Sequence, residues 1–118
     1  MRITVDLGAA SNIASLETGS YLYQDAWIFL PETVVWEGSM DGVEWNELAS
    51  ASTARVLDRD DRQQRATIQG EWTTKGRRAR YVRMTAKNAG PCPDWHAASG
   101  SASWLFLDEC VIRTQDSP

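Results

Sequence analysis

Short stretches in which apolar and polar residues alternate, each closed by a turn signal, recur along the whole chain. Ile3 and Val5 alternate with polar residues up to Gly8, which is the period of a strand with one buried face. Asp41 and Gly42 close another such stretch and form a dipeptide that favours a β-hairpin turn. No stretch has the spacing of a convincing amphipathic helix. We expect seven strands, over residues 2–7, 13–22, 32–40, 45–57, 65–74, 79–88 and 104–112.

This succession of strands predicts an all-β fold. Seven short strands separated by turns are typical of an antiparallel sandwich or barrel. A chain of 118 residues is long enough for one hydrophobic core and too short for two. We therefore expect one module over residues 2–113 and a loose tail over residues 114–118. The strand over residues 104–112 is so rich in apolar side chains that both of its faces should be covered.

Charge falls into three blocks along the chain. Residues 1–54 carry one Arg and eight acidic residues, residues 55–87 carry ten Lys or Arg and four acidic residues, and residues 88–118 carry one Arg and four acidic residues. The net charge of −4 argues against nucleic acid as a partner. The basic block could attract an acidic glycan or a phospholipid surface, but solvated arginines on a sheet are the simpler interpretation. No apolar run approaches the roughly 20 residues that a transmembrane helix needs.

Two stretches carry aromatic and polar side chains where no strand is expected, residues 23–31 and residues 88–96. An indole ring can stack on the apolar C–H face of a sugar, while imidazole and carboxylate groups hydrogen-bond its hydroxyls. Such a site is small and open, so its binding free energy should be only about −4 to −6 kcal/mol. The candidate binding residues are Tyr23, Asp25, Trp27, Asp94, Trp95 and His96.

Each of these tryptophans also has a structural interpretation. Trp95 could close the end of the sandwich, with His96 bound to a backbone carbonyl, and this alternative is about as well supported as sugar stacking. Trp27 is more simply a core residue or a contact to the stretch that contains Trp95. The other four are expected in the core or on a sheet face; they are Trp36, Trp45, Trp72 and Trp104.

Catalysis has little support in the residues themselves. A two-carboxylate hydrolase needs two acids about 5–10 Å apart across a cleft, whereas the acids here are scattered over strands and turns. Nothing obvious orients His96 as a base for Cys92, and Cys92, His96 and Cys110 do not have the spacing of a zinc site. We expect both cysteines to be free thiols, with a disulfide as the alternative in an exported protein.

Several motifs stand in a fixed order along the chain. Val5-Asp6-Leu7-Gly8, Ser39-Met40-Asp41-Gly42-Val43-Glu44-Trp45 and Arg80-Tyr81-Val82-Arg83-Met84 resemble the discoidin domain, also called the coagulation factor V/VIII type C domain. Residues 24–31, 92–96 and 102–109 look like the C-terminal discoidin-like module of bacterial glycoside hydrolase family 20 enzymes, the β-N-acetylhexosaminidases or chitobiases. The resemblance runs from about Ile3 to Ile112.

The resemblance implies a jelly-roll β-sandwich of the galactose-binding-like type. Family members usually have a segment before the Val5-Asp6-Leu7-Gly8 strand, so the resemblance implies that an N-terminal edge strand is missing. That segment often supplies an Asp for calcium, while Glu109 matches the late acidic position that ligates calcium in related modules. Calcium is therefore left open, and we expect no other cofactor.

The resemblance also implies a function. It indicates a non-catalytic carbohydrate-binding accessory module, with Trp95 as the stacking ring, as in carbohydrate-binding module family 32. The implied partners are a glycan of the N-acetylhexosamine or galactose type and a family 20 catalytic domain in a parent chain that is periplasmic, cell-surface or secreted. The alternatives are a purely structural module that packs on the catalytic barrel, and a lipid- or protein-binding discoidin domain.

Overall fold

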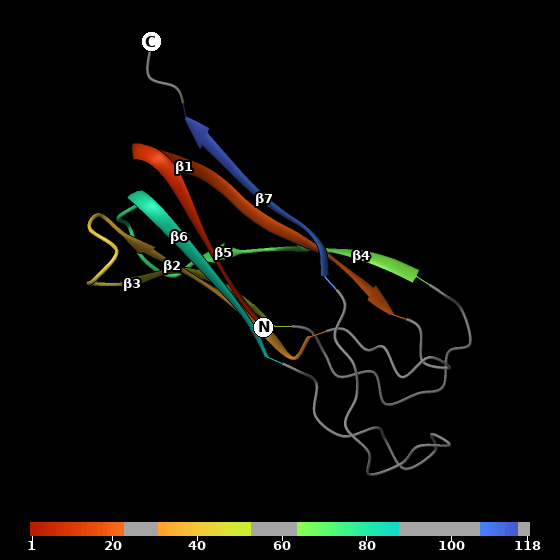
Figure 1. The fold of residues 1–118 in the computed structure, drawn as a ribbon. Helices are drawn as coiled ribbons and strands as arrows, with labels where there is room; N and C mark the ends of the chain where they lie inside the picture. The colour runs from red at the N-terminus through yellow and green to blue at the C-terminus, as the bar shows by residue number, and fades with distance from the viewer. Residues whose placement is uncertain (23–30, 53–63, 88–106, 116–118) are drawn as a thin grey trace.

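The computed structural model describes residues 1–22, 31–52, 64–87 and 107–115 (Figure 1). Within these ranges every regular element is a β-strand, and every strand pairing is antiparallel. The predicted all-β antiparallel sandwich is therefore confirmed. The strands are β1 (Arg2–Leu22), β2 (Thr33–Ser39), β3 (Asn46–Ser52), β4 (Gln64–Gln69), β5 (Glu71–Trp72), β6 (Arg78–Lys87) and β7 (Leu107–Gln115).

Strand β1 is one continuous, bent strand rather than two. Residues 2–6 pair with β6, residues 12–20 pair with β7, and residues 17–22 pair with β4. The bend is at Gly8, whose φ of 85° lies in the left-handed region and whose N–H donates to Asp6 Oδ1 at 2.8 Å. The expectation that one strand stops at Gly8 and another begins at Ile13 is therefore wrong. Glycine tolerates this backbone conformation, so the chain can bend here. Strand β1 is hydrogen-bonded to neighbouring strands both before and after the bend.

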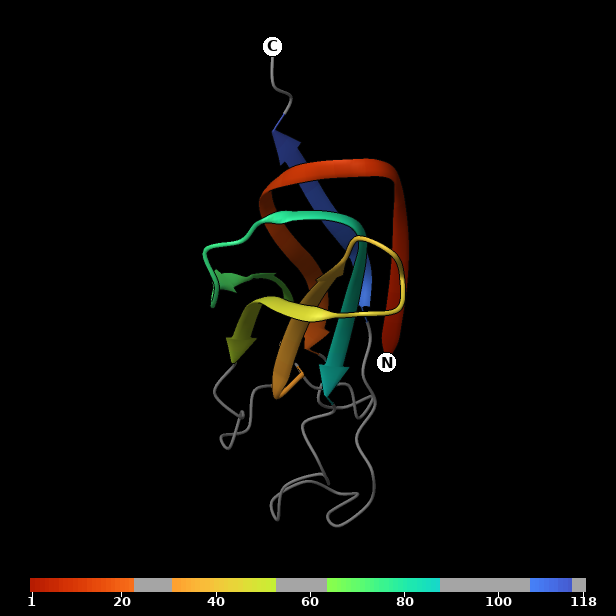
Figure 2. The same cartoon turned by 90° about the vertical axis from the view of Figure 1, so that its left-hand side faces the viewer.

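The bend divides the strands into two layers (Figures 1 and 2). The first half of β1 forms one layer with β6, β2, β3 and β5, and its second half forms the other with β7 and β4. The predicted strand over residues 65–74 is interrupted at Gly70, where the chain crosses from β4 to β5. The Gly70 N–H donates to the Leu16 carbonyl at 2.9 Å, and the Thr73 N–H donates to the Leu48 carbonyl at 2.9 Å. These two hydrogen bonds tie the crossing to both layers.

Trp36 is at the centre of the hydrophobic core between the layers. It lies on β2, alternates with half-buried residues and is 0% exposed, so its predicted place in the core is confirmed. The indole packs under Gly70, where a Cβ atom would be 3.0 Å from two of its ring carbons. The other buried apolar residues are Ile13, Leu16, Val34, Leu48, Ala49, Ile68, Ala79, Val82, Met84 and Ala86.

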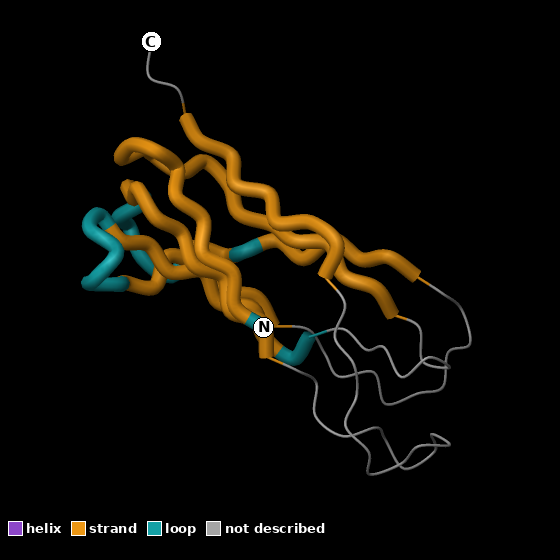
Figure 3. Tube along the Cα trace, viewed as in Figure 1, coloured by secondary structure: helices purple, strands orange, loops and turns teal. Residues whose placement is uncertain are grey.

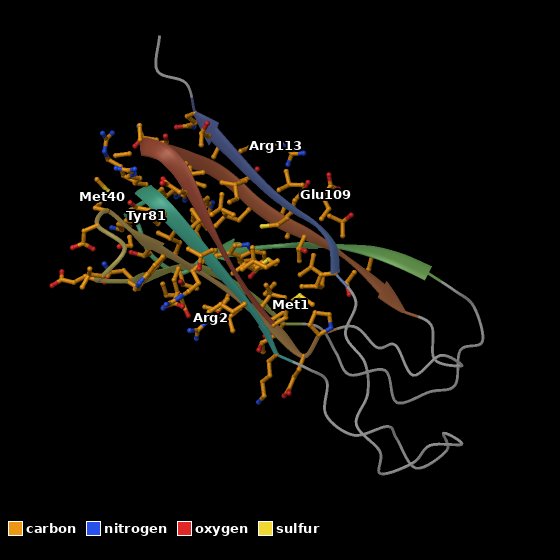
Figure 4. The ribbon with its side chains drawn as sticks, viewed as in Figure 1. Met1, Arg2, Met40, Tyr81, Glu109 and Arg113 are labelled. Carbon is orange, nitrogen blue, oxygen red and sulfur yellow. The ribbon has the colours of Figure 1, made fainter. Side chains whose placement is uncertain are left out.

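Strand β7 differs from its prediction. Glu109 and Arg113 are exposed along it, so the described part of this strand has a solvent-facing side rather than two covered faces (Figure 4). Within the described residues, the partner of β7 is β1. A strand at the edge of a sheet commonly carries charged side chains, which agrees with the exposed residues of β7. The strand also continues to Gln115, two residues into the expected tail.

The turn between β2 and β3 confirms the predicted hairpin and shows its chemistry. Asp41 Oδ1 accepts hydrogen bonds from the N–H groups of Val43 at 2.8 Å and Glu44 at 3.0 Å. Ser39 Oγ accepts from the Gly42 N–H at 2.8 Å, and Gly42 has a φ of 78°. The hydrogen bond from the Glu44 N–H, followed by that from Val43, lowers the pKa of the Asp41 carboxyl below 3.8.

The close contact at the layer crossing makes Gly70 intolerant of a side chain. Gly70→Ala should lower the free energy of unfolding by about 1–3 kcal/mol, because the new Cβ meets buried groups on two sides. Gly76→Ala is the matched control, since nothing lies within 4 Å of its added Cβ and the unfolded chain changes in the same way. Urea unfolding measures both. Equal stability of the two variants would contradict this packing.

The turn carboxylate predicts a specific pH dependence. The folded-state pKa of Asp41 is lowered, so its contribution to stability is complete above the unfolded pKa, near 3.8, and is lost as pH falls through the folded pKa. Asp41→Asn removes the titrating group while keeping an acceptor oxygen. The variant should melt below the wild type at pH 7, and the gap in Tm should close in acid. Thermal melts from pH 7 down to about pH 2 test this, and a constant gap over that range would refute it.

Candidate functional site

The two segments that carry the predicted sugar-binding residues are flanked by paired strand ends. Thr33 at the start of β2 pairs with Lys87 at the end of β6, and the Glu32 N–H donates to the Lys87 carbonyl at 2.9 Å. Near the end of β1, Ser20 pairs with Leu107, the first residue of β7. Both pairs lie at the same end of the sandwich (Figures 1 and 2). Strand pairing thus brings together the positions from which both segments leave and to which they return.

The predicted site residues themselves lie outside the described residues. This applies to Tyr23, Asp25, Trp27, Asp94, Trp95 and His96, and also to Cys92 and Trp104. Their roles in sugar binding, and the alternative that Trp95 closes the sandwich, stay predictions. The structure shows how the strand ends that these two segments connect are paired.

Glu109, the residue predicted as a calcium ligand, is an exposed residue of β7. Its backbone carbonyl accepts a hydrogen bond from Thr18 Oγ1 at 2.5 Å, which ties β7 to β1. Among the described residues, no three His, Cys, Asp or Glu side chains come close enough to hold a metal ion. Calcium binding through Glu109 therefore stays a prediction.

Cys110 carries a free thiol on β7, as the sequence predicted for this residue. The side chain is partly buried against the core, and this burial raises the pKa of the thiol above its ordinary value. A raised pKa reduces the thiolate fraction at neutral pH, and the thiolate is the nucleophilic form. Cys110 therefore behaves as a small core residue.

The outer face of the first layer holds a cluster that the sequence did not indicate. Arg83 on β6 donates two hydrogen bonds to Glu37 on β2, Nε to Oε1 at 3.1 Å and Nη2 to Oε2 at 3.2 Å. The guanidinium also lies over the Trp45 ring, 4.3 Å from its centroid. Trp45 comes just before β3, so this Arg–Glu–Trp contact joins β6, β2 and the hairpin. Trp45 is thus a sheet-face residue, one of the two places predicted for it.

A second arginine–carboxylate pair joins β6 to β1, and it is exposed. Arg80 donates to Asp6 through Nε at 3.1 Å and Nη2 at 3.3 Å, and its guanidinium lies 5.1 Å from the centroid of the Tyr81 ring. The hydrogen bond from Arg80, with that from the Gly8 N–H, lowers the pKa of the Asp6 carboxyl. The pair fixes the start of β1 against β6.

These contacts neutralise much of the basic block on the described surface. Arg80, Arg83 and Lys87 pair with Asp6, Glu37 and Glu32 in turn. Arg77 instead lies over the Trp72 ring, 4.3 Å from its centroid. The simpler interpretation of the block, as solvated side chains on a sheet, therefore fits Arg80 and Lys87, whereas Arg83 is shielded by its pair with Glu37.

Two of the hollows on the molecule are lined entirely by described residues. The larger, of 450 Å³, lies between β3 and β4 and is lined by Ser50, Ala51, Ser52, Ala66, Thr67, Ile68, Gln69 and Glu71. The smaller, of 260 Å³, lies between the β2–β3 hairpin and the β5–β6 turn. Both are lined by a mixture of polar and apolar residues, so both suit small ligands that carry polar groups better than large apolar ones.

The sequence matches no family model and no curated protein. In structure, the chain is similar to the C-terminal domain of a chitobiase from Bacteroides fragilis, with a TM-score of 0.45 and 18% sequence identity. The match covers 97% of this chain and 62% of the other, so this chain spans less than two thirds of its length. A likeness of this degree supports no inference, and the fold assignment depends on the observed strands. Among the described residues, no helix is long and apolar enough to cross a membrane.

The Arg83–Glu37–Trp45 contact should be sensitive to the shape of the cation. Arg83→Lys keeps the charge but loses the second hydrogen bond and the planar stack, so stability should fall by about 1–2 kcal/mol. The pair is well shielded, with side-chain exposures of 20% and 24%. Arg113→Lys is the control: Arg113 makes a 3.0 Å ion pair with Glu17, is 59% exposed, and should change stability by less than about 0.5 kcal/mol. Similar losses in urea unfolding would refute a special role for Arg83.

Proposed function

We propose that this chain is a non-catalytic carbohydrate-binding module that acts as an accessory to a glycosidase. The observation that carries the proposal is the pairing of strand ends around the two aromatic segments. Lys87 and Thr33 flank one side, Ser20 and Leu107 flank the other, and both pairs lie at one end of the sandwich. Antiparallel sandwiches commonly present their binding residues on loops at such an end, on a rigid scaffold. The residues proposed to act there are Trp95 and His96, with Asp94, Asp25, Tyr23 and Trp27.

The chemistry of these residues suits a neutral sugar. The Trp95 indole stacks on the C–H face of the ring, and His96 and Asp94 bind its hydroxyls. The motif order along the chain resembles the discoidin-like module of family 20 β-N-acetylhexosaminidases, so the proposed ligand is a glycan of the N-acetylhexosamine or galactose type. The proposed partner is a family 20 catalytic domain, which supplies the acidic pair that hydrolysis requires.

A weak site is sufficient for this function. Stacking of one ring with a few hydrogen bonds supports a Kd from about millimolar to tens of micromolar. Tethered to a catalytic domain, such a module raises the effective concentration of the enzyme at the glycan without any further contact. The function therefore needs retention of the polymer and not tight capture of a monosaccharide.

The test is retention of the chain on an immobilised glycan of the N-acetylhexosamine type. Trp95→Ala should abolish retention and leave Tm within a few degrees of the wild type. Trp45→Ala is the matched control, since it removes the same side chain from the outer sheet face and should keep retention.

Two results would contradict the proposal. A loss of about 3–5 kcal/mol of stability in Trp95→Ala would make Trp95 a core residue, as large-to-small substitutions in a core do. Absence of retention by the wild-type chain on glycans of both types would leave the purely structural alternative, a module that packs on a catalytic barrel.

A further inference from the structure

The smaller hollow lies at the opposite end of the sandwich from the paired strand ends. It is lined by residues of the β2–β3 hairpin and of the β5–β6 turn, which both lie at this end of the molecule (Figure 3). All of its lining residues belong to the described part of the chain. Its volume of 260 Å³ suits a single small molecule. This position makes it independent of the proposed sugar site.

The hollow is lined by both apolar and polar residues. Leu48 is only 4% exposed, while Met40 is 53% exposed and lies near Tyr81 at this end of the molecule (Figure 4). Asn46 from the hairpin and Thr74 from the turn also line the hollow, and their side chains carry an amide and a hydroxyl. Arg78, an exposed residue at the start of β6, lines it as well and carries a guanidinium. The residues that line this hollow therefore include one cation, two neutral side chains that can form hydrogen bonds, and apolar side chains.

Among the described residues of the basic block, Arg78 differs from Arg80 and Arg83 in having no carboxylate partner. Arg80 and Arg83 pair with carboxylates, and the Arg77 guanidinium covers an indole ring. Arg78, by contrast, forms no salt bridge with any residue that the structure describes. Asp41, which follows the lining residue Met40, accepts hydrogen bonds within its own turn. An anion in the hollow would therefore meet a guanidinium that no described carboxylate neutralises.

We propose that this hollow binds a small organic carboxylate that also carries hydroxyl groups, the chemistry of a sugar acid. The carboxylate accepts two parallel hydrogen bonds from the Arg78 guanidinium, a geometry that the planar fork of Arg favours. Asn46 and Thr74 bind hydroxyls, and Leu48 and Met40 contact the C–H face. A neutral sugar lacks the group that Arg78 recognises, and a simple carboxylate lacks the hydroxyls.

The test is a titration of the 118-residue chain with glucuronate up to about 50 mM, because a site of this size should bind in the millimolar range. Amide shifts in an ¹⁵N–¹H spectrum report the site. We expect shifts at the Asn46 side-chain amide and around Thr74 to Arg78, with much smaller shifts on addition of glucose. Arg78→Ala should weaken binding about tenfold or more.

Lys75→Ala is the matched control, because it removes one positive charge from the same turn outside the hollow. It should change the affinity less than about twofold at physiological salt, where exposed charges are screened. Equal weakening by both variants would mean diffuse charge attraction and would overturn the proposal. Binding of glucose as tight as that of glucuronate, shifts confined to other residues, or no shifts up to the highest concentration would each overturn it as well.

Discussion

Strand β1 is the element on which the rest of the molecule depends, because it belongs to both layers. Its first half is hydrogen-bonded to β6, and its second half lies between β7 and β4. The bend at Gly8 lets one strand serve both layers without a loop. Its register also places Ser20 opposite Leu107, and so determines where the chain leaves toward the proposed sugar site. Register along a strand with a buried face is strongly specified, because a slip of one residue would turn its apolar side chains outward.

The layers are held at their spacing by Trp36, and the chain around it has adapted to the ring. Gly70, which has no Cβ, lets β4 cross to β5 directly over the indole, and small side chains such as Ala49 line the same region. The ring is fully buried, and an indole contributes a large apolar area to the core. The crossing can approach the Trp36 ring this closely because residue 70 is a glycine, and the ring in turn fills the space below the crossing.

Local chemistry was predictable from the sequence, and long-range pairing was not. The hairpin at Asp41 and Gly42 could be predicted because the turn is made by hydrogen bonds between neighbours in the chain. Gly8 was predicted as a strand end, since a glycine that ends a strand and one that bends it look alike locally. The contact of Arg83 with Glu37 and Trp45 was missed because it depends on β6 lying beside β2. Of the candidate site, the sequence supplied the residues, and the pairing of the strand ends that flank them came from the structure.

The distribution of ion pairs gives the two ends of the sandwich different chemistry. At the strand ends, Lys87 is paired with Glu32, so the described rim of the proposed sugar site carries a compensated charge and suits a neutral ligand. Farther from this end along β6, Arg83 is paired with Glu37 and Arg80 with Asp6. Arg78 stands on the same strand as Arg80 and Arg83 but has no carboxylate partner in the described part of the chain. Because an uncompensated guanidinium beside a hollow attracts anions while paired ones do not, net charge along the sequence is a poor guide to where anions bind. Where an anion binds depends on which basic residues have a carboxylate partner close by.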